Sequence, residues 1–314
     1  MFIHHVAHYL PETVVPNSYF TEINGLTDEW IQGRTGIRER RKASGTENTN
    51  TMALAALENL LPGLGFDPAD FDLIVGATYT PYDTIATLAH TAQNRLGIAP
   101  IPVISISTAC SSFLNAMEIV QGYFAMGKAS KALVLVADHN TAYSNEHDQK
   151  AGHLWGDGAA AVAVVKEKVK ETDFQILDIR TAGAGSVGKA MEGVVLRPLD
   201  GGCLMPNGRD VFLYACQYMA QVTKEIVSDN GLTLEQVDYL IPHQANQRIS
   251  LNVTESLGLP LEKLISNIPY LGNTGCAGCA IALSENHTRF LPGQHVVITV
   301  FGGGYSYGSM LLRT

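Results

Sequence analysis

Short, continuously apolar segments alternate with helical segments along the chain, and this alternation limits the possible fold more than any other feature. The expected strands are 1–10, 71–78, 103–108, 132–138, 159–165, 174–181, 237–241, 294–301 and 309–312. The expected helices are a short one capped by Thr27, those over 51–61, 113–126 and 211–228, and one whose end lies at 90–97; a Gly/Ala-rich turn into a further helix is expected over 271–283. Strands that are apolar on both faces are typical of sheets covered by helices on both sides. We therefore expect an α/β protein with layers built around a mainly parallel sheet.

The same order of elements recurs after a charged break at 166–172 (KEKVKET). The segment VDYLI at 237–241 echoes FDLIV at 71–75, and each follows an expected helix. Repetition of this kind is the signature of an internal duplication. The sequence predicts two halves, an N-terminal half over 1–168 and a C-terminal half over 169–314.

Charge and cysteine content exclude several classes of protein. The net charge of −9 argues against nucleic acid as a partner, so any anionic ligand needs a local group of Arg or Lys. The five dispersed cysteines do not resemble a disulfide framework, which favours a reducing compartment. The first residues lack the pattern of a signal peptide, and no run of 18 apolar residues could span a membrane. We expect a cytoplasmic protein with no membrane contact.

Cys110 lies between the expected strand 103–108 and the expected helix 113–126. A thiol on the first turn of a helix meets unpaired N–H groups and the positive end of the helix dipole, which favour the thiolate. The flanking Ala109 and Ser111 are small and leave room for an incoming acyl group. The alternative is a buried structural cysteine, which is common.

Three later motifs favour a catalytic role for this cysteine. His243, in PHQAN, follows the expected strand 237–241, where sites of α/β sheets collect, although such a histidine can also be a satisfied polar residue. Asn273 lies in the loop GNTG, and the glycines at 302–304 leave backbone N–H groups free to line an oxyanion hole. The order Cys, His, Asn, Gly-Gly-Gly is more specific than any one of these signals.

A second cluster is basic. Arg34, Arg38, Arg40, Arg41 and Lys42 follow Trp30 in an otherwise acidic chain. The alternatives are a solvated loop and a phosphate site; arginine beside a planar ring favours the phosphate site.

The whole chain resembles the β-ketoacyl-acyl carrier protein synthase III family of the thiolase superfamily. The matching motifs are DEW at 28–30, GRTGIRER at 33–40, TAC at 108–110, WGDGAA at 155–160, PHQAN at 242–246, GNT at 272–274 and FGGG at 301–304. The resemblance implies a five-layered αβαβα thiolase-like fold made of two duplicated halves, and a homodimer. It implies transfer of an acyl group from acyl-CoA to Cys110, followed by decarboxylating condensation with malonyl-acyl carrier protein. The product is a 3-oxoacyl-acyl carrier protein, which initiates fatty acid synthesis.

The resemblance also implies roles for individual residues. The backbone N–H groups of Cys110 and Gly303 would form the oxyanion hole, while His243 and Asn273 would donate to the enolate left by decarboxylation. No metal and no cofactor are expected. No carboxylate base is needed either, because loss of carbon dioxide itself generates the carbanion. The residues expected at the remaining sites are Thr27, Trp30, Arg34, Asn246 and Arg248 for coenzyme A, Arg209 and Arg248 for the carrier protein, and Ile85 and Phe301 for the acyl pocket.

Departures from the family pattern leave alternatives open. Gln149, followed by Lys150, stands where relatives usually have a phosphate-binding Arg, and the region around Ile85 matches relatives poorly. A specialised-metabolism relative with a longer or unusual acyl donor or acceptor is therefore the main alternative. A Cys-His-Asn hydrolase and a catalytically silent binding module are weaker hypotheses. The pair Cys276 and Cys279 lacks the further ligands of a zinc site, so we expect small-residue packing there.

Overall fold

Nine strands form one continuous mixed sheet in the order β11-β12-β13-β8-β1-β7-β6-β4-β5. The computed structural model describes residues 1–314. The sheet strands are β1 (Phe2–Tyr9), β4 (Leu73–Ala77), β5 (Val103–Ile106), β6 (Lys131–His139), β7 (Asp157–Val165), β8 (Phe174–Gly183), β11 (Tyr239–Pro242), β12 (His295–Phe301) and β13 (Ser306–Arg313). Two small antiparallel pairs lie outside it: β2 (Thr13–Pro16) with β3 (Glu39–Lys42), and β9 (Val195–Arg197) with β10 (Gly202–Leu204).

Five predicted helices lie close to observed ones, whereas the helix expected within 271–283 begins only at Gly278, and the helices at 17–24 and 247–256 were not predicted. The observed helices are α1 (Asn17–Asn24), α2 (Asp28–Thr35), α3 (Thr49–Leu60), α4 (Leu88–Leu96), α5 (Ser112–Ala125), α6 (Asn140–Tyr143), α7 (Ala190–Gly193), α8 (Gly208–Asp229), α9 (Gln247–Ser256), α10 (Ile268–Leu271) and α11 (Gly278–Asn286). Thr27 caps α2 as predicted, because its side chain accepts a hydrogen bond from the Trp30 N–H at 3.2 Å. None of these helices is long and apolar enough to cross a membrane.

The expectation of a mainly parallel sheet is wrong. Only β4–β5, β4–β6 and β11–β12 are parallel, and the other neighbouring strands are antiparallel. A continuous apolar run shows that a strand is buried on both faces, but it carries no information about direction. Here β7 and β13 are buried between helix layers although they run antiparallel to their neighbours.

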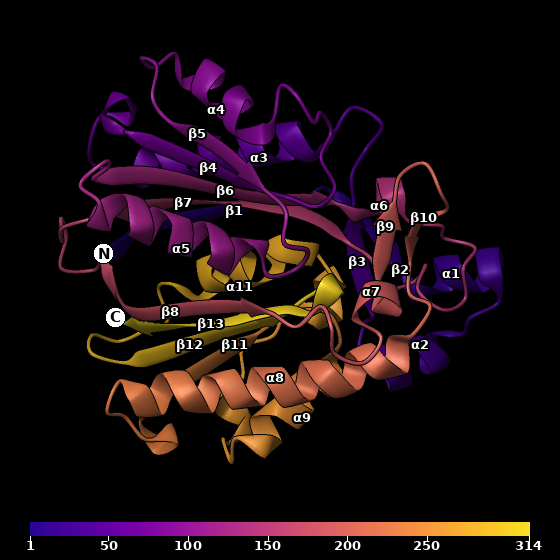
Figure 1. The fold of residues 1–314 in the computed structure, drawn as a ribbon. Helices are drawn as coiled ribbons and strands as arrows, with labels where there is room; N and C mark the ends of the chain where they lie inside the picture. The colour runs from indigo at the N-terminus through magenta and orange to yellow at the C-terminus, as the bar shows by residue number, and fades with distance from the viewer.

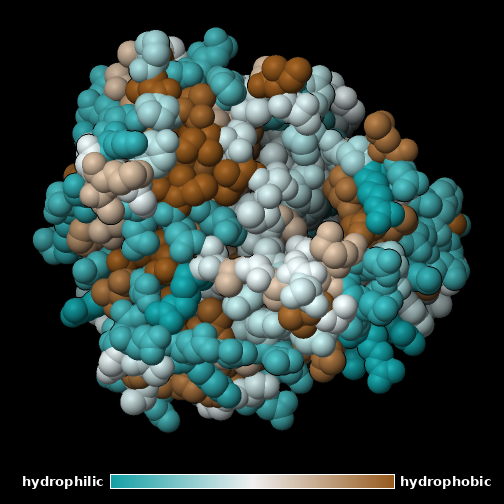
Figure 2. Space-filling view, viewed as in Figure 1, coloured by the Kyte–Doolittle hydropathy of each residue, from teal (hydrophilic) through white to brown (hydrophobic).

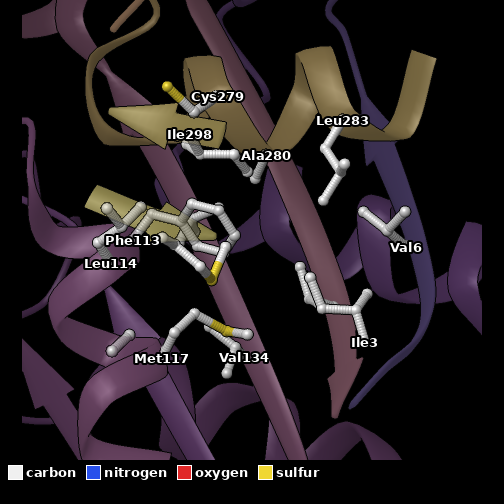
Figure 3. Packing of buried hydrophobic residues seen from close by; sticks show 14 of the residues in the cluster. Ile3, Val6, Phe113, Leu114, Met117, Val134, Cys279, Ala280, Leu283 and Ile298 are labelled. Carbon is white, nitrogen blue, oxygen red and sulfur yellow. The ribbon is translucent and has the colours of Figure 1, made fainter. Parts of the chain in front are cut away.

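The elements stack in five layers (Figure 1). Helices α3 and α4 cover one sheet half, α5 and α11 fill the middle, and α8 and α9 cover the other half. Three hydrophobic clusters occupy the interfaces between layers, and the largest, of 37 buried residues, lies in the middle. Figure 3 shows side chains of α5, such as Phe113 and Met117, converging there with side chains of α11, such as Leu283. This confirms the thiolase-like layered α/β architecture.

The two sheet halves meet at one narrow seam. Strands β1 and β8 pair only at Phe2 with Gln175 and at Ile3 with Phe174. The charged segment 166–172 lies in the loop from β7 to β8, which connects the halves. At the other end of the molecule, the ends of β4, β5, β6 and β11 and the start of α5 bring the candidate site residues to one region.

Candidate active site

Cys110 lies on a sharp turn between β5 and α5. Ala109, directly before it, has a φ of 50°, which is unusual for a residue with a side chain. Ser112 braces the turn: its hydroxyl donates to the Ala109 carbonyl at 2.6 Å and accepts from the Thr108 N–H at 2.8 Å. The local sequence therefore fixes the direction in which the thiol points.

The surroundings of Cys110 favour the protonated thiol over the thiolate. Helix α5 begins only at Ser112, with Ser111 as its N-cap, so Cys110 lies before the first turn rather than on it. Burial raises the pKa of the Cys110 thiol to about 12, and the nearby Asp138 carboxylate raises it further. Hydrogen bonds from the Tyr79 hydroxyl and the Gly303 N–H lower this pKa, but by less than burial raises it. The prediction of a thiolate stabilised by the helix start is wrong for this reason.

A cavity of about 200 Å³ opens beside the thiol. Its lining residues come from both halves of the chain: Tyr79, Ser107, Ala109, Cys110, Trp155, Val194, Leu196, Cys203 and Gly303. Gly302 permits the close approach of the glycine segment, because a Cβ there would lie 2.7 Å from the Cys110 nitrogen. In the view of Figure 2 the surface is hollowed to the right of its centre, near the region where Figure 1 places α7 and β9.

His243 follows β11 directly, as predicted. Its N–H donates to the Thr299 carbonyl at 2.8 Å, which continues the pairing of β11 with β12. The side chain is buried, and burial lowers the pKa of the imidazole to about 4. Neither ring nitrogen hydrogen-bonds to another protein group, so the neutral ring is free to exchange a proton or a hydrogen bond with a substrate.

Asn273 lies beside the cavity-lining residue Trp155, and its side-chain oxygen is already paired. Its Oδ1 accepts from the Gly275 N–H at 3.0 Å, and its backbone pairs with Leu154 and Gly156. No protein acceptor takes a hydrogen bond from its Nδ2, so this group is available as a donor. The pairing also places Trp155, which lines the cavity, directly beside Asn273.

A buried carboxylate, Asp138 at the end of β6, organises this region, and sequence reasoning missed it. Asp138 accepts from the Thr78 and Thr80 hydroxyls at 3.0 and 2.9 Å and from the N–H groups of Tyr79 and Cys276 at 3.1 and 2.7 Å. Burial nevertheless raises its pKa to about 6. The sequence feature that could have identified Asp138 is an acidic residue at the carboxyl end of a buried strand.

Tyr79 was missed as well. Its hydroxyl donates to Asn140 Oδ1 at 2.7 Å, and Asn140 Nδ2 donates in turn to the carbonyls of Gly156 and Asn273, at 2.8 and 3.3 Å. This chain of hydrogen bonds connects the surroundings of Cys110 with Asn273. The segment around Tyr79 has no regular pattern, so only the structure reveals its contacts.

The residues predicted to hold coenzyme A lie together on the surface. The Arg34 guanidinium stacks over the Trp30 ring at 4.5 Å. Asn246 caps α9 and donates from Nδ2 to the Arg34 carbonyl at 3.2 Å, which ties the second half of the chain to α2. Arg248, in the first turn of α9, is exposed and lies 5.9 Å from the Phe212 ring.

The basic cluster is not one phosphate site. Arg40 is fully buried, donates to the carbonyls of Val15 and His153, and has a pKa lowered by burial to about 10. Lys42 forms an ion pair with Glu146 at 2.6 Å. Arg41 donates to backbone carbonyls, so only Arg34 and Arg38 stay exposed and free of such bonds. The spacing in sequence did not reveal that β3 directs alternate side chains into the protein.

Arg209 lies in the first turn of α8, not in the predicted loop, because this helix begins at Gly208. Its side chain is exposed and borders a surface hollow of about 550 Å³. Lys189, Phe212 and Leu213 also line this hollow. The region therefore combines positive charge with exposed apolar surface.

The remaining predicted residues lie apart from the cavity. Ile85 is 86% exposed, and Phe301 is buried against Tyr218 and Tyr305 on the α8 side of the sheet. Exposed Gln149 donates to the Asn24 carbonyl at 2.6 Å. Cys276 and Cys279 pack in the middle hydrophobic cluster, as predicted from their small neighbours.

Comparisons with known proteins agree on one family. The model of the "3-Oxoacyl-[acyl-carrier-protein (ACP)] synthase III" domain matches residues 104–185, and the model of its C-terminal domain matches residues 227–314. The chain is 33% identical to the β-ketoacyl-[acyl-carrier-protein] synthase III of Nitratidesulfovibrio vulgaris, over 97% of this chain and 96% of the relative. It is 34% identical to synthase III 1 of Bacillus cereus, over 98% and 97%. The solved 3-oxoacyl-[acyl-carrier-protein] synthase III of Aquifex aeolicus is similar with a TM-score of 0.93 and 35% identity, over 100% of this chain and 99% of that structure.

Proposed function

The chain belongs to the 3-oxoacyl-[acyl-carrier-protein] synthase III family, and on this premise we propose that Cys110, His243 and Asn273 are its catalytic residues. The protein is an acyltransferase that condenses an acyl primer with malonyl-acyl carrier protein and initiates fatty acid synthesis. The observation that carries the assignment of residues is the combination of a thiol beside a cavity, a neutral histidine and an asparagine whose amide N–H groups are unpaired.

The first half-reaction transfers the acyl group from acyl-CoA to Cys110. The sulfur attacks the thioester carbonyl, the bond from the acyl carbon to Sγ forms, and the bond to the CoA sulfur breaks. Because the pKa of Cys110 is raised to about 12, the thiol proton must leave as the bond forms. The neutral His243 imidazole can accept this proton and return it to the departing CoA thiolate. The N–H groups of Cys110 and Gly303 would stabilise the tetrahedral oxyanion, a role supported by the Gly303 N–H directed at Cys110.

The second half-reaction forms the new carbon–carbon bond. The malonyl thioester loses carbon dioxide, and its electron pair becomes an enolate. Hydrogen bonds from His243 and from Asn273 Nδ2 would stabilise the enolate oxygen. The enolate carbon then attacks the acyl group on Cys110, and the Cys110 sulfur leaves as the 3-oxoacyl product forms. Since decarboxylation supplies the electron pair, the residues require neither a metal nor a bound cofactor.

Two surface regions would hold the substrates. Trp30, Arg34, Asn246 and Arg248, next to the Thr27-capped helix, would bind coenzyme A, since arginine and indole groups stack on planar bases. Arg209 together with Arg248 would engage the acidic carrier protein, because an enzyme of net charge −9 needs a local basic surface for it.

We further propose that the enzyme works as a homodimer in the cytoplasm. Strand β5 is an unpaired edge of the sheet and is only half-buried, as expected for a strand that pairs with a second copy. In Figure 2 hydrophobic side chains gather over the region where Figure 1 places β5 and α5. Ile85, exposed in the loop before α4, would then contribute to the partner's acyl pocket. Five free cysteines fit a reducing compartment.

The test separates the two half-reactions. Intact mass spectrometry measures the adduct on Cys110 after addition of acyl-CoA, and gel or mass analysis of the carrier protein then measures condensation. We expect an adduct that is stable without malonyl-acyl carrier protein and that disappears as 3-oxoacyl-acyl carrier protein forms. Release of free acid in the absence of the carrier protein would instead support the hydrolase hypothesis.

A further inference from the structure

We propose that Tyr79 is a rigid wall of the acyl cavity and restricts the primer to short acyl groups, of up to about six carbons. The inference rests on the proposed role of Cys110, since the same cavity must hold the acyl group after its transfer. The acyl carbon becomes bonded to Sγ, coenzyme A leaves with the proton lost from the thiol, and the alkyl chain of the primer extends into the cavity.

The Tyr79 ring is held at both ends. At the backbone end, its N–H donates to buried Asp138 at 3.1 Å, and Asp138 also binds Thr78 and Thr80 on either side. At the other end, the hydroxyl donates to Asn140, which is itself fixed by its bond to the Gly156 carbonyl. The ring cannot swing aside to admit a longer chain without breaking the hydrogen bond from its hydroxyl to buried Asn140.

The loop on the far side of the ring fixes it further. Gly275 has a φ of +63°, and a Cβ there would lie 2.5 Å from the Tyr79 hydroxyl. The loop that carries Asn273 therefore packs directly against the tip of the ring. The loop with Asn273 and the Tyr79 ring are therefore in direct contact, and the same contacts position both of them.

The space left for a primer is small. Trp155 is buried and faces the same cavity, and Leu196 and Cys203 also line it. The volume of about 200 Å³ corresponds to about six or seven groups of the size of a water molecule or a methylene, at roughly 30 Å³ each. An acyl group of eight or more carbons exceeds this volume, and overpacking a fixed wall is unfavourable.

The experiment measures the rate of Cys110 acylation by intact mass, with acetyl-, butyryl-, hexanoyl-, octanoyl- and decanoyl-CoA. The parent enzyme should accept the first three and react with decanoyl-CoA at least tenfold more slowly. Tyr79→Ala and Tyr79→Leu remove the ring and should raise the relative rate with octanoyl- and decanoyl-CoA at least tenfold. Tyr79→Phe keeps the ring but loses the hydroxyl bond to Asn140, so it should relax the cut-off less than Tyr79→Leu does. Tyr82→Ala, which removes an exposed tyrosine three residues away, is the matched control and should leave the profile unchanged.

The outcomes are distinct. If the parent enzyme is acylated equally well by acetyl- and decanoyl-CoA, the cavity does not limit the primer and the proposal is overturned. The proposal is also overturned if folded Tyr79→Leu keeps the cut-off of the parent enzyme. If no acyl-CoA acylates Cys110, the proposed function itself fails. Should Tyr79→Ala not fold, the profiles of the parent enzyme and of Tyr79→Leu still decide the question.

Discussion

Replacement of Asn273 should separate condensation from acyl transfer. In Asn273→Ala the Nδ2 donor is lost, and with it one of the two hydrogen bonds to the enolate oxygen. Loss of one preorganised oxyanion donor lowers the rate of the chemical step by about 100- to 1,000-fold, equivalent to about 3 to 4 kcal/mol. Acylation of Cys110 does not form this enolate, so its rate should change by less than about threefold. Intact mass of the enzyme and quantitation of 3-oxoacyl-acyl carrier protein measure the two rates.

The structure supplies two further variants for this test. Asn273→Ala also removes the acceptor of the Gly275 N–H, which should lower the free energy of unfolding by about 1–3 kcal/mol. Asn273→Asp keeps an oxygen for that N–H but has no donor, so it should condense as poorly as Asn273→Ala. Asn267→Ala is the matched control: this buried asparagine donates to Gly278 and Glu285, and its loss should lower stability without changing the ratio of the two rates. Equal losses in both half-reactions of Asn273→Asp would refute the assigned role.

Three other predictions follow from the site. Cys110→Ser should give no stable acyl adduct, because a serine hydroxyl ionises less readily than the thiol; an adduct in this variant would contradict the assignment of the nucleophile. Arg209→Glu should raise the KM for malonyl-acyl carrier protein several-fold at low salt, and added salt should raise this KM in the parent enzyme. Lys224→Glu, at an exposed position of the same helix α8, is the control and should leave the KM unchanged. Burial lowers the pKa of His243 to about 4, so its charged form, which cannot accept the thiol proton, appears only as the pH falls through that value. Acylation of Cys110 by acyl-CoA should therefore be constant between about pH 5.5 and 8 and decrease below about pH 5, and a midpoint near pH 6.5 would contradict this account.

The sequence predicted the sheet strands and the longer helices except α9 well, because hydrophobic pattern and capping residues are local signals, but it missed α1 and α9. Thr27 is the N-cap of α2, and Gly97 ends α4 with a φ of 63°, both as the sequence indicated. Strand direction was not predictable in this way. Strands β4 and β7 are equally apolar, but β4 runs parallel to β6 and β7 runs antiparallel to it. Direction depends on how the connections cross the sheet, which is a property of the whole fold.

At the site, sequence identified residues by type and position but not by environment. Cys110, His243 and Asn273 could be selected because each lies at the end of an apolar segment or in a glycine-rich loop. Their electrostatics could not be predicted: the pKa of Cys110 depends on burial by residues distant in sequence. Asp138 shows the same limit, because its four donors come from two loops that only the fold brings together.

The role of Arg40 illustrates how burial can reverse an interpretation. In sequence it belongs to the largest positive cluster, but in the structure it is fully buried and hydrogen-bonds to Asn17 and to the backbone before Trp155. The three consecutive basic residues Arg40, Arg41 and Lys42 could not be divided into surface and interior members without the pairing of β3 with β2.

The central claim is that Cys110 carries an acyl group, and that this group leaves the enzyme only by condensation with malonyl-acyl carrier protein that has lost carbon dioxide. The most direct measurement follows the mass of enzyme acylated with acetyl-CoA, freed of excess donor, before and after addition of malonyl-acyl carrier protein. The account predicts that the adduct on Cys110 persists until the addition and then disappears with formation of an equal amount of 3-oxoacyl-acyl carrier protein. Loss of the adduct as free acetate, at the same rate with and without malonyl-acyl carrier protein, would contradict it.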